Sequence, residues 1–156
     1  MRYAGIAGVV LALSLAGCLA PAAQVTARNW RPMGAGGLNL GQLVAVSPGL
    51  REVTWESYDG PAGDTVVRLA VEYDPARTAP GCPVPAAGNI RADRAFLLLT
   101  LSVAGTGAVD FVSAEARAYS AAGAYASTPL DIGVIADLTT RGSPLPCAAL
   151  AVPASL

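Results

Sequence analysis

The chain has 156 residues, of which 53% are hydrophobic and 13% are charged, and its formal net charge is −1. This balance excludes a disordered chain, which would combine low hydrophobicity with high net charge. All ten basic residues are arginine and are interspersed with eleven acidic residues. Because no cluster of positive charge is present, we expect no nucleic-acid partner.

Residues 1–17 have the organisation of a bacterial signal peptide. Arg2 supplies a positive start, residues 4–15 are uncharged and mostly apolar, and small residues follow. The motif Leu15-Ala16-Gly17-Cys18 then resembles the lipobox of bacterial lipoproteins. The apolar stretch is shorter than the roughly 20 residues that a membrane-spanning helix needs. Two alternatives are an ordinary secretory signal that contains a cysteine and an uncleaved anchor helix.

The lipoprotein resemblance carries specific implications for Cys18. In that family cleavage falls just before the cysteine, and its sulfur receives a diacylglyceryl group. The resemblance therefore implies acyl chains such as palmitate on Cys18, and a protein held to a membrane of the cell envelope, facing the periplasm or the exterior. By similarity to enterobacterial lipoproteins, Leu19 in place of an aspartate favours the outer membrane.

The next segment, residues 18–40, is predicted to be a flexible tether. It is rich in proline and glycine, including Pro32-Met33-Gly34-Ala35-Gly36-Gly37, a composition typical of linkers without regular structure. Trp30 is unusual there. Either Trp30 packs back onto the following domain, or the first strand begins earlier than expected.

Residues 41–156 are predicted to form one all-β domain, an antiparallel β-sandwich. Residues 64–73 alternate between apolar and polar positions, as expected of a half-buried strand. Four of their apolar residues share one face: Val67, Leu69, Val71 and Tyr73. Further strands are predicted over residues 51–58, 94–104 and 109–119. The nearly continuous apolar run of residues 94–104 predicts a central strand covered on both faces.

Two features refine this prediction. The order of residues 96–103, a glycine-containing turn, residues 109–119 and then Gly123 and Tyr125 is similar to immunoglobulin-like domains of small bacterial lipoproteins. This resemblance implies an immunoglobulin-like sandwich and no particular chemistry. Residues 130–138 fit a strand and a short helix equally well.

Cys82 and Cys147 are predicted to form a disulfide, because they are an even pair in an exported chain. Such a bond would also hold the predicted long loop of residues 74–93. A metal site and a redox pair are the alternatives. The chain lacks the histidines that would complete a zinc site and has no Cys-x-x-Cys motif.

The sequence offers little catalytic chemistry. Without histidine or lysine it lacks the usual triads, cysteine–histidine pairs, Schiff-base lysines and phosphate-binding loops. Four carboxylates are left as candidates for a glycosidase pair: Asp110, Glu115, Asp131 and Asp137. The turn over residues 59–64 is a candidate source of oxygen ligands for calcium. Three arginines are candidates for holding an anionic ligand: Arg77, Arg91 and Arg94.

We therefore expect a non-catalytic, lipid-anchored envelope protein that presents its β-domain for protein interaction or envelope assembly. The expected partners are a membrane, through Cys18, and an envelope protein. No catalytic residue, metal site or cofactor is predicted. One alternative is a lipoprotein that binds a small ligand or ion at the loop of residues 74–93. A carboxylate-dependent hydrolase is the other.

Overall fold

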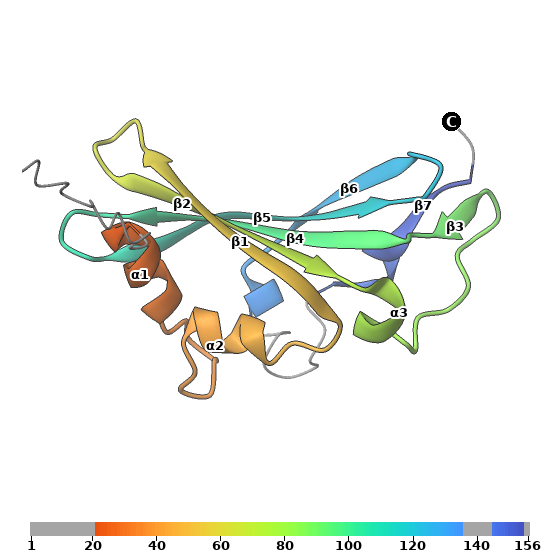
Figure 1. The fold of residues 1–156 in the computed structure, drawn as a ribbon, viewed down its shortest axis with the longest axis horizontal. Helices are drawn as coiled ribbons and strands as arrows, with labels where there is room; N and C mark the ends of the chain where they lie inside the picture. The colour runs from red at the N-terminus through yellow and green to blue at the C-terminus, as the bar shows by residue number, and fades with distance from the viewer. Residues whose placement is uncertain (1–20, 136–144, 155–156) are drawn as a thin grey trace, which may run out of the picture.

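The computed structural model describes residues 21–135 and 145–154 (Figure 1). Its elements in chain order are the helices α1 (Ala22–Asn29) and α2 (Leu40–Ala45), the strands β1 (Leu50–Asp59) and β2 (Thr65–Tyr73), the helix α3 (Pro75–Thr78), the strands β3 (Asn89–Arg91), β4 (Arg94–Val103), β5 (Val109–Tyr119) and β6 (Tyr125–Leu130), the short 3-10 helix η1 (Cys147–Leu150) and the strand β7 (Ala151–Pro153).

The strands form one large and one small sheet. The large sheet is antiparallel, with five strands in the order β1-β2-β4-β5-β6, and the small sheet pairs β3 with β7. The prediction of an antiparallel β-rich domain is thus confirmed. The small sheet has only three residues in each strand. The predicted sandwich of two packed sheets is not confirmed.

The alternation read from the sequence sets the two faces of the large sheet. Val67, Leu69 and Val71 of β2 are fully buried on one face, as predicted from their period of two. They pair with Leu101, Leu99 and Leu97 of β4, and these six side chains form the centre of the core.

The central strand β4 is covered less completely than predicted. Its place in the middle of the sheet is confirmed, but its residues alternate between buried and half-buried positions. Phe96, Leu98 and Thr100 lie on the face that the helices leave uncovered. The prediction that both faces of this strand are covered was therefore wrong, because nothing in the described chain packs fully over the second face.

Helices α1 and α2 correct the prediction of a tether. Residues 22–29 are helical, so the expectation of no regular structure over residues 18–40 was wrong for that part. Helix α1 contacts β1, β2 and β4. A short helix with so few large apolar residues gains most of its stability from such packing, which a single sequence does not show. Trp30 packs against the core, which confirms the first of its two alternatives.

Asn39 starts α2 with a reciprocal cap. Its side chain accepts a hydrogen bond from the backbone of Gln42, whose side chain accepts one from the backbone of Asn39. This arrangement satisfies two backbone donors that the start of a helix leaves free. Leu40 and Leu43 then lie fully buried, so the cap fixes where α2 meets the core.

Predictions near the two ends of the chain are tested only in part. Residues 125–130 form β6 and residues 133–135 are helical. Residues 136–144 lie outside the described part of the chain, and so do residues 1–20, which include Cys18. Within residues 130–138, Leu130 ends β6 and residues 133–135 agree with the helix alternative, while residues 136–138 lie outside the described part. Among the described residues, none of the helices is both long and apolar enough to cross a membrane.

Candidate functional site

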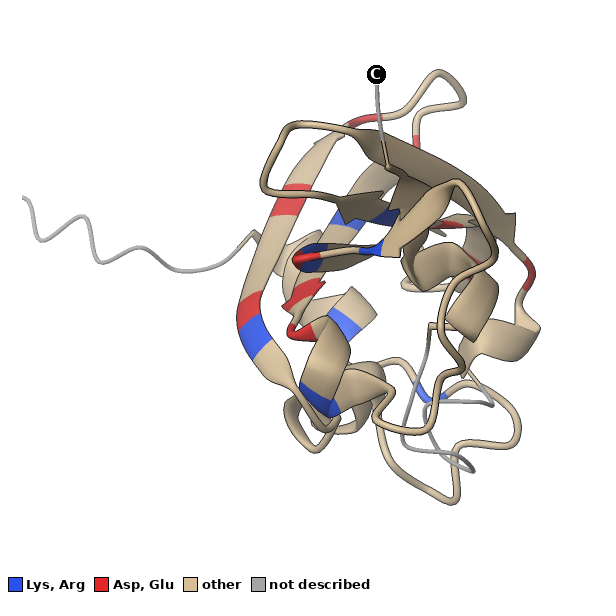
Figure 2. Cartoon of the chain, turned by 90° about the vertical axis from the view of Figure 1, so that its right-hand side faces the viewer, with Lys and Arg blue, Asp and Glu red and all other residues tan. Residues whose placement is uncertain are grey.

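The face of the large sheet opposite α1 and α2 is the first candidate site, and we call it the open face. Every strand contributes alternate residues to it, as the strand register shows. Figure 2 shows acidic and basic residues interspersed along strands of this sheet. The open face contains Tyr58, Arg68, Glu72, Phe96, Leu98, Glu115, Arg117, Tyr119, Tyr125 and Ser127.

A two-pronged ion pair ties β4 to β2 on this face. Arg94 Nε donates to Glu72 Oε1 at 2.8 Å, and Arg94 Nη2 donates to Glu72 Oε2 at 2.9 Å. The hydrogen bonds from Arg94 lower the pKa of Glu72 despite the opposing effect of burial, and the charge of Arg51 adds to the lowering. Glu72 therefore stays ionised although its side chain is only 10% exposed.

A second ion pair of the same kind lies on β5. Arg117 donates to Glu115 from Nε at 2.7 Å and from Nη2 at 3.1 Å, and the hydroxyl of Ser127 donates to Glu115 Oε1. These hydrogen bonds, first from Arg117 and then from Ser127, lower the pKa of Glu115. Like Glu72, this carboxylate is held in its charged form.

Aromatic rings form a row beside these ion pairs. The rings of Phe96 and Tyr119 meet edge to face at 5.7 Å, and those of Tyr119 and Tyr125 stack at 5.8 Å. The Arg94 guanidinium lies 5.1 Å from the centre of the Phe96 ring. A shallow hollow of about 230 Å³ on this face is lined by Arg94, Phe96, Leu98, Arg117 and Tyr119. The open face thus joins aromatic rings to arginine side chains around one depression.

The carboxylates suggested for a hydrolase do not converge. Glu115 is paired with Arg117, and Asp131 accepts a hydrogen bond from the backbone of Gly133 at 2.7 Å. Asp110 is exposed near the start of β5, and Asp137 lies outside the described residues. In the described part of the chain, Asp110, Glu115 and Asp131 are not joined to one another by a hydrogen bond.

The suggested calcium turn is the hairpin that connects β1 and β2. The backbone of Gly60 donates to the carbonyl of Asp64 at 2.8 Å, and the hydroxyl of Ser102 donates to the Asp64 carboxylate. Within residues 21–135 and 145–154, no group of three or more acidic, cysteine or histidine residues is placed to hold a metal ion. Hydrogen bonds within the protein therefore account for the conformation of this turn.

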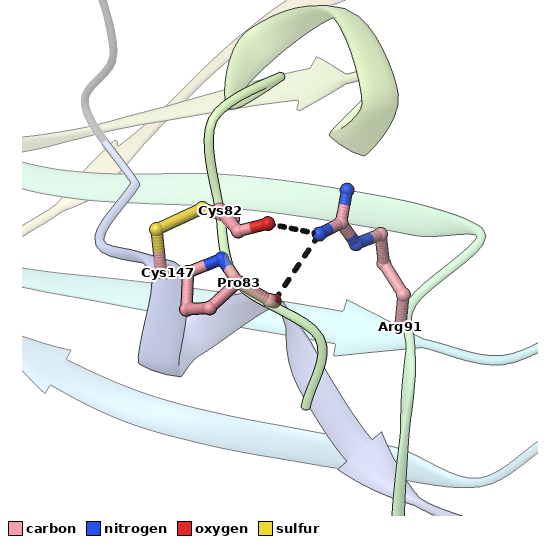
Figure 3. Close-up of a disulfide and its surroundings, with 4 residues drawn as sticks. All are labelled: Cys82, Pro83, Arg91 and Cys147. Carbon is pink, nitrogen blue, oxygen red and sulfur yellow. Dashed lines mark hydrogen bonds between the residues drawn. A yellow bond between two sulfur atoms is a disulfide. The ribbon is translucent and has the colours of Figure 1, made fainter. Parts of the chain in front are cut away.

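The disulfide marks the second candidate site. Cys82 and Cys147 are bonded, with their Cα atoms 5.3 Å apart, so this prediction is confirmed. In Figure 3 the Arg91 guanidinium reaches across to the same loop, where Nη2 donates to the carbonyls of Cys82 at 2.6 Å and Pro83 at 3.3 Å. The disulfide and Arg91 together fix the conformation of the loop that follows Cys82.

A hollow of about 370 Å³ lies beside this bond, and we call it the disulfide hollow. Its lining includes Pro83, Val84, Asn89, Arg91, Cys147 and Leu150. The loop of residues 74–93, predicted to lack regular structure, contains α3 and β3. Asp74 followed by Pro75 was a visible signal for the start of α3, whereas β3 pairs with a strand distant in sequence, which no local pattern could reveal.

The three arginines suggested for an anionic ligand lie in different places. Arg77 is in α3, Arg94 is on the open face, and Arg91 lines the disulfide hollow. Among the described residues, Arg91 makes no ion pair with a carboxylate. Only Arg91 therefore keeps the role of a candidate anion-binding residue in a hollow.

Sequence reasoning missed the open face because one of its two ion pairs joins residues far apart in the chain. Arg94 and Glu72 are 22 positions apart, and their meeting depends on the strand register. The alternation of Glu115, Arg117 and Tyr119 with alanines was a visible signal, since it indicates a strand with one charged and aromatic face. Comparison with protein-family models, curated protein sequences and solved structures finds no match to this chain.

Proposed function

We propose that this chain is a non-catalytic, lipid-anchored envelope protein that binds a protein partner through its open face. The observation that carries the proposal is the row of Phe96, Tyr119 and Tyr125 beside Arg94 and Arg117. Tyrosine, phenylalanine and arginine are enriched in protein interfaces, and the residues that dominate binding free energy are often tyrosine and arginine.

The location rests on the lipobox and is supported by the disulfide. A diacylglyceryl group on Cys18 would hold the domain at a membrane without a spanning helix. The bond between Cys82 and Cys147 suits the oxidising side of a bacterial inner membrane, where disulfides persist. With Leu19 after the cysteine, we place the protein at the outer membrane.

The electrostatics of the open face argue against a hydrolase. A glycosidase needs one carboxylic acid with a raised pKa to protonate the leaving group. The pKa values of Glu72 and Glu115 are instead lowered by Arg94 and Arg117. Neither residue suits the role of a general acid, so the open face does not support a hydrolase.

A photoreactive amino acid at Tyr125 tests the binding surface in the native envelope. Tyr125 is 57% exposed at the edge of the open face, and Met33 is 98% exposed in the loop between α1 and α2. We expect crosslinking from position 125 to one protein in high yield, with little from position 33. Equal capture from both positions, or none from position 125, would contradict the proposed surface.

The disulfide hollow favours a second candidate function, the binding of a small apolar ligand with one anionic group. Its volume of about 370 Å³ lies at the lower end of the range for ligand pockets. Its lining is largely apolar, and Arg91 is a positive group without an acidic partner in the described chain. A guanidinium carries five N–H donors, and hydrogen bonds to Cys82 and Pro83 engage only Nη2.

Two ligands of equal chain length, one anionic and one neutral, test this second candidate function separately from the first. We expect decanoate to raise the melting temperature of the protein more than decanol does, and Arg91→Gln to remove the difference. Arg77→Gln, on α3 outside the hollow, should leave the difference between decanoate and decanol unchanged. If decanoate and decanol raise the melting temperature equally, or if neither raises it, the disulfide hollow is not an anion-binding site.

A further inference from the structure

The large sheet has two ends that differ in what they carry. At one end, which we call the anchor end, Asp59, Thr65, Val103 and Val109 pair across four strands. At the other, the disulfide end, lie Tyr73 and the small sheet of β3 and β7 (Figure 1). The span of β2 from Thr65 to Tyr73 corresponds to roughly 26 Å at about 3.3 Å per residue.

The first described residues are fixed at the anchor end. The carbonyl of Pro21 accepts hydrogen bonds from the backbone of Gln24 at 2.9 Å and Val25 at 3.2 Å. The Gln24 side chain donates to Ser57 Oγ at 3.2 Å, near the end of β1. Val25 also lines a hollow together with Gly107 of the turn between β4 and β5. The start of α1 therefore belongs to the folded domain.

This position limits how far the domain lies from a lipid on Cys18. Only Leu19 and Ala20 separate Cys18 from Pro21. Three residue steps span at most about 11 Å when fully extended. That reach is less than half the length of β2, so a lipid on Cys18 stays near the anchor end and cannot reach the disulfide end.

The two segments nearest to the anchor, the start of α1 and the β4–β5 turn, contain no charged residue. Residues 21–26 and the β4–β5 turn over residues 104–108 have no acidic or basic side chain, and Val25 is 45% exposed. The neighbouring β1–β2 turn carries Asp59 and Asp64. Contact with a lipid surface costs least where no charged group must lose its water.

We infer that the domain stands on the membrane through the start of α1 and the β4–β5 turn, with the disulfide end pointing away. The inference rests on the proposed lipidation of Cys18. In this orientation the lipid surface contacts residues 21–26 and 104–108. The disulfide hollow then lies at the membrane-distal end, and the open face runs between the two ends, accessible to a partner in the same membrane or in solution.

Two hairpin turns of similar composition provide a matched test. Thr106 lies in the β4–β5 turn at the anchor end, and Ala122 lies in the β5–β6 turn at the disulfide end; both are exposed, and neither turn contains a charged residue. Thr106→Cys and Ala122→Cys each add one thiol for an NBD fluorophore, while the native disulfide stays oxidised. The lipidated mature protein, which begins at Cys18, is reconstituted into phosphatidylethanolamine–phosphatidylglycerol vesicles that contain a lipid with a nitroxide on its headgroup.

We expect severalfold stronger quenching of the fluorophore at position 106 than at position 122. Equal quenching, or stronger quenching at position 122, would overturn the orientation while leaving the anchor intact. Mass spectrometry of the N-terminal peptide reports on the anchor separately. A peptide without the diacylglyceryl group on Cys18 would overturn the proposed lipidation and the orientation together. Cys18→Ser should abolish quenching at both positions.

Discussion

Arg94 and Glu72 form a two-pronged ion pair in which one partner is exposed and the other is buried. The Arg94 side chain is 56% exposed and that of Glu72 is 10% exposed. The exposed guanidinium therefore compensates a carboxylate that has lost most of its water. Such an arrangement is asymmetric, because removal of the arginine leaves an ionised group without its main partner.

Arg94→Gln should destabilise the fold in a pH-dependent way. The pKa of Glu72 is lowered from 4.5 in the folded state, so the stabilisation from its ionised form is complete above pH 4.5 and is lost as the pH falls through the folded value. We expect the difference in free energy of unfolding between wild type and variant to be largest at neutral pH and to shrink below pH 4.5. Urea titrations at several pH values measure this difference.

Arg77→Gln is the control for the loss of one positive charge. Arg77 lies in α3 and makes no ion pair within the part of the chain that the structure describes. Its effect should be small at every pH. A pH-independent loss in Arg94→Gln equal to that in Arg77→Gln would contradict the role assigned to the Glu72 carboxylate.

Removal of the disulfide should cost roughly 4 kcal/mol of stability, the value that chain entropy gives for a closed loop of this length. The bond joins residues separated by 65 positions. We expect the double substitution Cys82→Ala and Cys147→Ala to lower the urea midpoint. A reducing agent should lower the wild-type midpoint by a similar amount and leave the double variant unchanged. Equal urea midpoints for the wild type and the double variant, both without reducing agent, would contradict a stabilising bond.

Local pattern was sufficient to predict β1, β2, β4 and β5, but not β3, β6, β7 or the helices that cover the large sheet. Residues 64–73 were predicted to be a strand because their apolar residues alternate with a period of two, and residues 109–119 because they follow a glycine-containing turn after the preceding strand. Both predictions are confirmed. Helix α1 has no comparable pattern. It forms where Ala27 is fully buried in the core and Arg28 lies over the Trp55 ring, and these contacts depend on the finished sheet.

The two candidate sites were predictable to different degrees. The disulfide was predicted from the number of cysteines in an exported chain. The disulfide hollow lies directly beside this bond, so the prediction also indicated where the second site is. The open face depends on the pairing of β2 with β4 and of β4 with β5. The alternation over residues 64–73 places Arg68 and Glu72 on the face opposite Val67 and Leu69, but no local pattern indicates which residue of β4 lies next to Glu72.

Gly49 should tolerate substitution much less well than Gly63. Both have positive φ, +77° and +80°, a conformation that costs a residue with a side chain about 1 kcal/mol or more. A Cβ at Gly49 would also lie 2.8 Å from the backbone nitrogen of Thr78, whereas a Cβ at Gly63 would meet nothing within 4 Å. Gly49→Ala should therefore lower the free energy of unfolding clearly more than Gly63→Ala in urea titrations. Equal losses would show that the backbone conformation alone sets the cost.

Tyr73 is a fully buried residue at the disulfide end of β2. Burial raises its pKa from 10.0 to about 12, and the nearby Ser47 offsets only part of this rise. The Ser47 hydroxyl donates its own hydrogen bond to the carbonyl of Leu43. The Tyr73 hydroxyl itself has no hydrogen-bond partner in the described chain. Ionisation of this residue is therefore coupled to unfolding.

The protein should lose stability between pH 10 and 12, because the unfolded chain releases the Tyr73 proton at a lower pH than the folded one. The stabilisation is complete below pH 10 and falls by up to about 1.4 kcal/mol per pH unit as the pH rises. Tyr73→Phe keeps the ring and removes the unsatisfied hydroxyl, so it should be at least as stable as wild type at neutral pH. Its free energy of unfolding should also decline less steeply above pH 10. Identical alkaline profiles for the two proteins would show that other groups control the loss.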